Sequence, residues 1–91
     1  MQDQTTIERA PGAVEALVDD QVVLLSPIDF SYHALDPVGA RIWSLLETPR
    51  TFGDLIAELT ASYSIDAQTC IADVTPFVAR MSEIGVLAYS D

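Results

Sequence analysis

The chain has 91 residues, of which 49% are hydrophobic, and this is enough for one small domain with a single core but too little for two. Its formal net charge at pH 7 is −10, because the chain has 14 acidic residues, 4 arginines and no lysine. Nucleic acids and anionic membranes are both bound through clusters of Lys and Arg, so the charge excludes both classes of partner.

The first residues of the chain, Met1 to Gly12, are polar and show no sustained hydrophobic period. They end in Pro11-Gly12, a pair that is typical of turns. We therefore predict that residues 1–12 form a flexible N-terminal arm that contributes little to the fold. The folded domain is expected to comprise residues 13–91.

The next segment predicts three short strands. Apolar residues alternate over Ala13–Val18, and the turn pair Asp19-Asp20 separates them from the mostly apolar run Gln21–Leu25. This pattern predicts a hairpin. Polar residues and a proline then interrupt it before a third strand over Phe30–Ala34. The three strands are expected to form an antiparallel meander.

The following segments have helical periodicity. Asp36 can cap a first helix, and Pro37 has the φ that the first helical position requires. The pair Thr48-Pro49 ends this helix. Thr51 can cap a second helix, in which apolar residues recur at helical spacing.

The longest predicted helix covers about Ala67 to Ile84 and carries a broad apolar stripe. Because a proline inside a helix removes a backbone donor and collides with the carbonyl four residues before it, we predict a kink or a broken turn near Ala72–Pro76. Gly85 is placed to end the helix in a left-handed conformation. The tail Val86–Tyr89 is expected to pack as a short extension or a strand.

Strands followed by helices indicate an α+β fold, in which a three-stranded antiparallel sheet packs at one side of three helices. The closest description is winged-helix-turn-helix-like. Trp43 lies beside the apolar face of the first helix and is expected in the core. A DNA-binding role would require basic residues on the third helix, which offers only Arg80 among acidic neighbours.

The sequence contains no catalytic or metal-binding pattern. His33 and Cys70 are each the sole residue of their type and have no flanking signature of a nucleophile and base. The acidic residues lack metal-ligand spacing, so we expect no enzyme activity, no metal and no cofactor. The apolar run Val22–Leu25 is too short to span a bilayer, and Met1–Gln4 has no signal-peptide features, so we expect a cytoplasmic protein.

Three motifs in a fixed order carry a family resemblance. The first is Leu35-Asp36-Pro37-Val38-Gly39-Ala40-Arg41-Ile42-Trp43, the second is Thr51-Phe52-Gly53-Asp54-Leu55, and the third extends from Asp73 to Leu87. This set resembles the PqqD-like domains called RiPP recognition elements, and most of all the stand-alone proteins of lasso-peptide biosynthesis. The resemblance covers roughly Gln21 to Leu87.

The resemblance implies a non-catalytic adaptor that binds the leader of a ribosomally synthesised precursor peptide. The leader is expected to add as an antiparallel strand to the third strand, with its side chains in a groove formed with the third helix. The strand residues that the resemblance implies are Phe30, Ser31, Tyr32, His33 and Ala34. The groove wall that it implies consists of Asp73, Val74, Phe77, Val78 and Met81.

The resemblance also implies partners. A leader peptidase and a macrocyclase would receive the bound precursor, and the adaptor is expected to be a monomer or a weak homodimer. One alternative is a PqqD-type peptide chaperone of another RiPP pathway. A second is a general interaction or dimerisation domain, in which the exposed strand pairs with its own copy. The apolar stripe of the third helix is also compatible with ordinary core packing.

Overall fold

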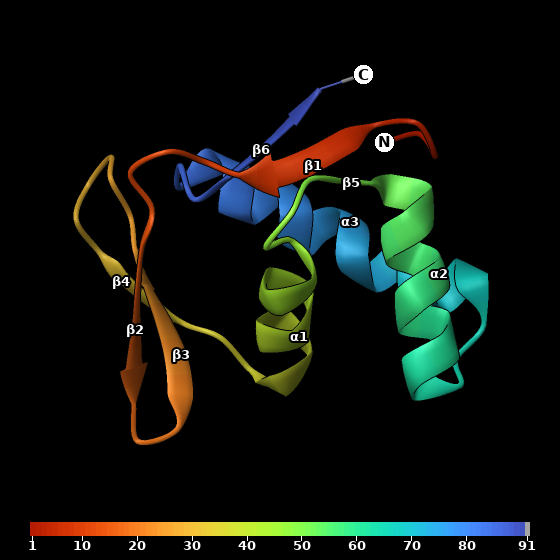
Figure 1. Ribbon diagram of the computed structural model, residues 1–91, viewed down its shortest axis with the longest axis horizontal. Helices are drawn as coiled ribbons and strands as arrows, with labels where there is room; N and C mark the ends of the chain where they lie inside the picture. Colours follow the sequence, from red (N-terminus) through yellow and green to blue (C-terminus); the bar gives the residue numbers. More distant parts are fainter. Residues whose placement is uncertain (91) are drawn as a thin grey trace.

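A computed structural model describes residues 1–90 of the chain. Two small sheets and three helices make up the domain (Figure 1). The elements in chain order are β1 (Thr6–Arg9), β2 (Val14–Val18), β3 (Gln21–Leu25), β4 (Tyr32–Ala34), α1 (Pro37–Leu45), β5 (Arg50–Thr51), α2 (Phe52–Tyr63), α3 (Ala67–Glu83) and β6 (Leu87–Ser90).

The predicted meander is confirmed as an antiparallel sheet in the order β2-β3-β4. Asp19 and Asp20 both have positive φ, which is the turn geometry that suits a two-residue hairpin loop. The third strand is shorter than predicted and begins at Tyr32. Phe30 has φ +60, so its backbone is left-handed and belongs to the turn that precedes the strand.

A second sheet, in the order β5-β1-β6, was not predicted. Its central strand, Thr6–Arg9, pairs with β6 along its whole length, and Ile7 is fully buried. Arg9 places its guanidinium 4.2 Å from the centre of the Trp43 ring and donates a 2.7 Å hydrogen bond to the Trp43 carbonyl oxygen. The prediction that residues 1–12 contribute little to the fold is therefore wrong for this strand.

The predicted starts of the first two helices are confirmed. The Asp36 carboxylate accepts a 2.7 Å hydrogen bond from the Gly39 amide, and Pro37 is the first residue of α1. Thr51 caps α2 through a 3.2 Å hydrogen bond from the Asp54 amide. Each cap satisfies an amide that has no partner within its own helix.

The third helix runs from Ala67 to Glu83 without a break, so of the predicted kink or broken turn near Ala72–Pro76 the broken turn is wrong. Pro76 cannot donate to the carbonyl of Ala72, but Ala72 is exposed and water can bind that oxygen. Gly85 follows the helix with φ +82, as predicted. A Cβ there would also lie 2.8 Å from Ile28 Cδ1, so the exposed Ile28 side chain would have to move, and the positive φ is the main reason for glycine.

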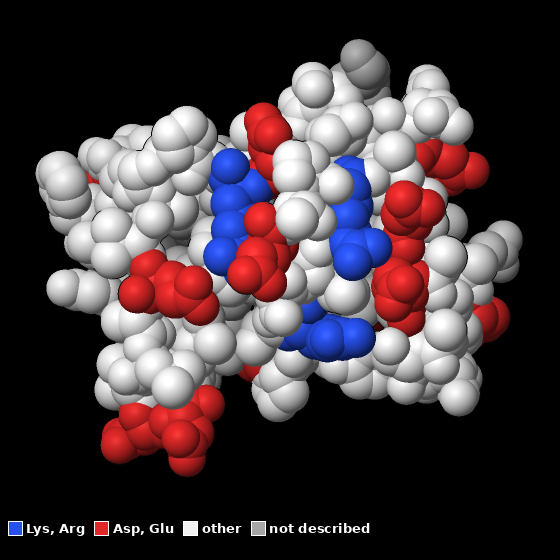
Figure 2. All heavy atoms as spheres, viewed as in Figure 1, with Lys and Arg blue, Asp and Glu red and all other residues white. Residues whose placement is uncertain are grey.

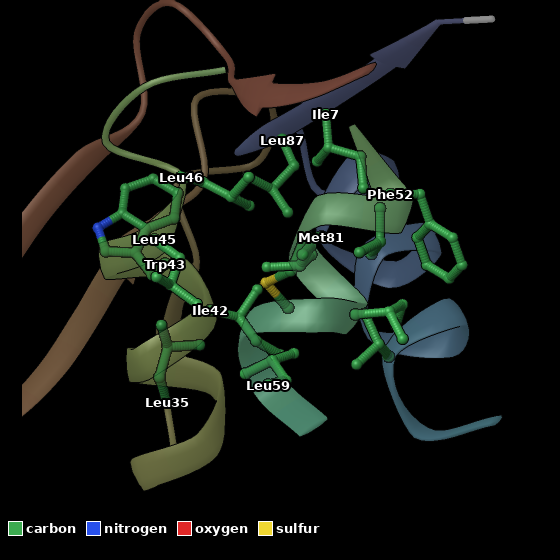
Figure 3. Close-up of a cluster of buried hydrophobic side chains, with 14 of the residues drawn as sticks. Ile7, Leu35, Ile42, Trp43, Leu45, Leu46, Phe52, Leu59, Met81 and Leu87 are labelled. Carbon is green, nitrogen blue, oxygen red and sulfur yellow. The ribbon is translucent and has the colours of Figure 1, made fainter. Parts of the chain in front are cut away.

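All three helices and both sheets contribute to a single core (Figure 3). Trp43 is 4% exposed and belongs to this core, as predicted. Val78 and Met81 of α3 also lie in it, between the helices. The core uses one stripe of α3, and the side of the helix next to that stripe remains available at the surface.

The N-terminal cap of α3 makes the stability of the domain depend on pH. The Asp66 carboxylate accepts a hydrogen bond of 2.7 Å from the Thr69 amide, and this bond is the main reason why the pKa of Asp66 is lowered. Because the folded pKa lies below the unfolded one, about 4, the cap stabilises the fold above that pH and loses its effect as the pH falls through the folded pKa.

We expect Asp66→Asn to retain the cap without this titration. The free energy of unfolding is measured with urea at pH 6 and at pH 3. On going from pH 6 to pH 3, it should fall less in the variant than in the wild type. Equal losses in the two proteins would contradict the assignment.

Candidate functional site

Within residues 1–90, no strand lies beside the outer edge of β4. There, β4 pairs with β3 alone, and β6, near the end of the described chain, pairs with β1 in the other sheet (Figure 1). An open edge presents main-chain N–H and C=O groups that can pair with an added strand. The tail therefore leaves free the edge at which the sequence predicted a bound peptide.

The hydrogen bonds of β4 identify which groups face outward. Leu35 N donates to Val22 O, and Ser31 O accepts from Ser26 N, each at 2.9 Å. Main-chain groups alternate in direction along an antiparallel strand, so the groups of His33 also point toward β3. The N–H and C=O groups of the two intervening residues, Tyr32 and Ala34, point away from the sheet and are available to a further strand.

A groove of about 500 Å³ separates this edge from α3. One wall is the continuous segment Tyr32–Asp36, and the other is the side of α3 beside the core. The α3 residues that line it are Pro76, Phe77, Arg80 and Met81. The open strand edge and the groove therefore form one surface.

The wall formed by α3 has a deeper and a shallower stripe. Phe77 and Met81 are four residues apart, so they lie above one another on the helix; Phe77 is half-buried and Met81 is 4% exposed. Pro76 and Arg80 have the same spacing and are exposed, so they form the rim. An apolar side chain that enters the groove would contact Phe77 and Met81, while a polar neighbour would lie near the rim.

Ser31 connects His33 to an acidic residue next to the groove. The Ser31 hydroxyl donates a 2.6 Å hydrogen bond to the Asp29 carboxylate, and it lies 2.7 Å from His33 Nε2. Because the hydroxyl proton is used by Asp29, Nε2 must carry the proton in the second contact. The hydrogen bonds from Ser31 lower the pKa of Asp29. This chain of bonds holds the imidazole in a fixed position in the groove wall.

Ser26 joins the two walls of the groove. It is fully buried, and its hydroxyl donates a 2.6 Å hydrogen bond to the Ile84 carbonyl at the end of α3. The same oxygen accepts a 3.2 Å hydrogen bond from the Ile28 amide in the turn before β4. The side chain thus connects the end of α3 to the turn that leads into the strand.

The structure brings together half of the residues that the resemblance implied. Five of the ten line the groove: Tyr32, His33, Ala34, Phe77 and Met81. The side chain of Phe30 is 72% exposed in the turn, and Ser31 supports His33 without lining the groove. Four groove residues were missed: Leu35, Asp36, Pro76 and Arg80.

The remaining three implied residues point elsewhere on α3. Val78 is fully buried in the core. Asp73 and Val74 line a separate cavity, together with residues of α1 and α2. The implied wall therefore combined residues of the core stripe with residues that line the groove, and the spacing of Pro76 and Arg80 beside Phe77 and Met81 was the signal for the side of α3 that faces the groove.

The residues considered for catalysis and for metal binding are dispersed in the part of the chain that the structure describes. Residues 1–90 contain no group of three or more His, Cys, Asp or Glu placed to hold a metal ion. Cys70 lines the cavity of Asp73 and Val74, not the groove of His33, and burial raises the pKa of its thiol. Within the same residues, no helix is long and apolar enough to cross a membrane.

The charge distribution is predominantly acidic on the face shown in Figure 2, where basic side chains lie near the middle with carboxylates around them. Arg9 is 3.7 Å from Glu15, and Arg50 donates to the Leu45 carbonyl oxygen at the end of α1. These arginines are held by the fold. On this face, the carboxylates around the basic side chains oppose the binding of a polyanion.

Comparison with known proteins places the chain in a family. The family model described as "Coenzyme PQQ synthesis protein D (PqqD)" matches residues 21–87. The chain belongs to the PqqD family. Among solved structures, it is similar to TbiB1, determined in complex with the TbiA(beta) leader peptide: the identity is 35%, the TM-score is 0.80, and the match covers 92% of this chain and 99% of the other. No curated protein sequence matches.

These findings confirm the PqqD-like resemblance and the mixed fold. The family match covers the segment from β3 to the first residue of β6, and so contains both walls of the groove. The structural match extends over nearly the whole chain. The two walls of the groove therefore lie within the segment that matches the PqqD family model.

Proposed function

We propose that this PqqD-family protein is a non-catalytic adaptor that binds the leader segment of a ribosomally synthesised precursor peptide. The observation that carries the proposal is the open edge of β4 beside a groove of mixed polarity, whose α3 wall includes Phe77 and Met81. The similarity to TbiB1, solved with a leader peptide, supports a peptide as the occupant.

The proposed mode of binding is strand addition. The leader pairs with the outward main-chain groups of Tyr32 and Ala34, and these bonds contribute affinity that tolerates changes of sequence. Alternate side chains of the leader point to opposite faces of the extended sheet. Those on the inner face enter the groove, where Phe77 and Met81 select apolar side chains of suitable size.

The finer assignment is to lasso-peptide maturation in the cytoplasm, with a leader peptidase and a macrocyclase as the enzymes that receive the bound precursor. The sequence resemblance supports this assignment over a PqqD-type chaperone of another pathway. The reading frames beside this one test it: a short precursor, a small peptidase and an asparagine-synthetase-like cyclase are expected there. A pyrroloquinoline-quinone gene set in their place would contradict the lasso assignment and leave leader binding intact.

The direct test is a titration with leader peptide. Fluorescently labelled TbiA(beta) leader, and the leader of any precursor encoded beside this chain, are added in turn to the protein. We expect a Kd of about 1 μM or lower for its own leader, which corresponds to roughly −8 kcal/mol. No measurable binding of either peptide would contradict the proposal.

Phe77→Ala should weaken leader binding by roughly 30-fold, because truncating an aromatic residue at the centre of an interface costs about 2 kcal/mol. The ring is half-buried, so the domain should remain folded, which thermal unfolding of the same samples checks. Ile71→Ala is the matched control, since Ile71 is 39% exposed on the same helix and lies outside the groove. Equal affinities for the two variants would contradict the placement of the leader against Phe77.

A self-associating interaction domain is the second candidate, because the open edge of β4 can also pair with the same edge of another copy. Sedimentation with and without leader peptide separates the two functions. Dissociation of a dimer into monomers when the peptide is added supports the adaptor. A dimer whose sedimentation does not change when the peptide is added supports the second candidate.

A further inference from the structure

Arg80 is a positive charge at the rim of an otherwise apolar α3 wall. It lines the groove with Phe77 and Met81, and it is exposed. It is the sole basic residue of α3, in a chain whose net charge is −10. A cation at this place faces whatever occupies the groove.

The Arg80 side chain has no partner of its own in residues 1–90. The structure records no hydrogen bond or ion pair for its guanidinium there, although Asp36 lines the same groove. The Asp36 carboxylate instead accepts from the Gly39 amide. By contrast, the guanidinium groups of Arg9 and Arg50 are both bound to main-chain carbonyl oxygens. The Arg80 guanidinium therefore retains its full capacity to bind a carboxylate.

We infer that Arg80 is a specificity-determining residue that binds the side-chain carboxylate of an Asp or Glu in the leader peptide. The inference rests on the proposed function and adds the chemistry that the leader must supply. A guanidinium can bind a carboxylate through two parallel hydrogen bonds, which select for an acid over its amide.

The spacing of the groove residues places the acid within the leader sequence. Phe77 and Arg80 are three residues apart on a helix, so their Cβ atoms are about 5–6 Å apart. Side chains two residues apart on one face of a strand are separated by about 7 Å. The acid is therefore expected two residues from the apolar side chain that packs against Phe77.

A purely structural role for Arg80 predicts a different result. Arg80 lies in the last turn of α3, where a positive charge is favourable for the helix dipole. Replacing it would then lower the stability of the domain slightly and reduce binding of all peptides equally. Selection for an acid at one leader position would not depend on it.

The test is selection of binders from a displayed library of random peptides by four proteins: the wild type, Arg80→Gln, Arg80→Lys and Arg41→Gln. Arg41 is the matched control because it is exposed, lies outside the groove, and changes the net charge by the same one unit. The wild type and Arg41→Gln should enrich Asp or Glu at one position beside an apolar one. Arg80→Gln should retain the apolar preference and lose the acid, and Arg80→Lys should retain the acid in part.

The overall charge of the protein makes this test stringent, because a net charge of −10 disfavours acidic peptides in general. Acids should therefore be depleted at every other position. For a selected peptide, changing the acid to its amide should raise the Kd about tenfold for the wild type and less than twofold for Arg80→Gln.

Each other outcome overturns one of the two proposals. Apolar enrichment without an acid in the wild type, or an acid preference that survives in Arg80→Gln, overturns the role of Arg80 and leaves leader binding standing. No enriched pattern of any kind with the folded wild type overturns leader binding itself.

Discussion

Replacing Ala34 by proline is expected to raise the Kd for leader peptide by about 10- to 100-fold while the domain stays folded. The Ala34 N–H points away from β3, so its removal breaks no hydrogen bond of the protein's own sheet. A bound strand, however, would lose a donor for one of its carbonyl groups. An unpaired buried carbonyl costs about 1–3 kcal/mol, and the proline ring adds a steric obstacle at the edge.

Two control variants separate the effect of losing the Ala34 N–H from the other effects of the substitution. Ala34→Val retains the N–H and suits a strand, so it measures the effect of a larger side chain in the groove wall and should bind leader more tightly than Ala34→Pro does. Leu17→Pro places a proline on β2, the other edge of the same sheet, at a residue that is 70% exposed. The affinities of all three variants are measured by titration, and circular dichroism checks their folding. Strong binding by folded Ala34→Pro would contradict strand addition at β4.

The features that could be predicted from the sequence are those determined within a few residues. The cap at Asp36 and the proline after it act on the same turn, and the structure has both. The hairpin follows from Asp19 and Asp20 between two apolar runs. Local signals of this kind do not depend on the rest of the fold, which is why the α+β order could be predicted.

The second sheet could not be predicted, because its pairing is distant in sequence. Thr6–Arg9 contains one buried apolar residue, Ile7, and its partners β5 and β6 lie more than 40 residues away. No period identifies such a strand from its own residues. The partners stabilise it, together with the stacking of Arg9 on Trp43.

The groove wall was only partly predictable for a related reason. A helical period identifies an apolar stripe but does not separate the part that packs in the core from the part that lines a groove. Val74 and Val78 belong to the former, whereas Phe77 lies at the boundary and faces the groove. The sequence argument considered Arg80 for DNA binding alone, and its position beside Phe77 and Met81 in the groove follows only from the structure.

Ser26→Ala should destabilise the domain by about 2 kcal/mol and lower the Tm by roughly 10 °C, which is a large effect for removing one oxygen atom. The Ser26 hydroxyl is the donor for the Ile84 carbonyl and the acceptor for the Ile28 amide. Both groups lose their partner in the variant. Thermal and urea unfolding measure the loss, and Ser31→Ala is the control, since its hydrogen bond to Asp29 is exposed and should contribute within about 0.5 kcal/mol.

The same substitution should also weaken leader binding, because Ser26 connects the end of α3 to the turn before β4 and so determines the distance between the groove walls. The titration is performed well below the Tm of the variant, where its folded fraction is close to complete. An affinity loss of several-fold under those conditions then reports a groove of altered width. If the fully folded Ser26→Ala protein binds leader as tightly as the wild type, the walls are positioned without this hydrogen bond.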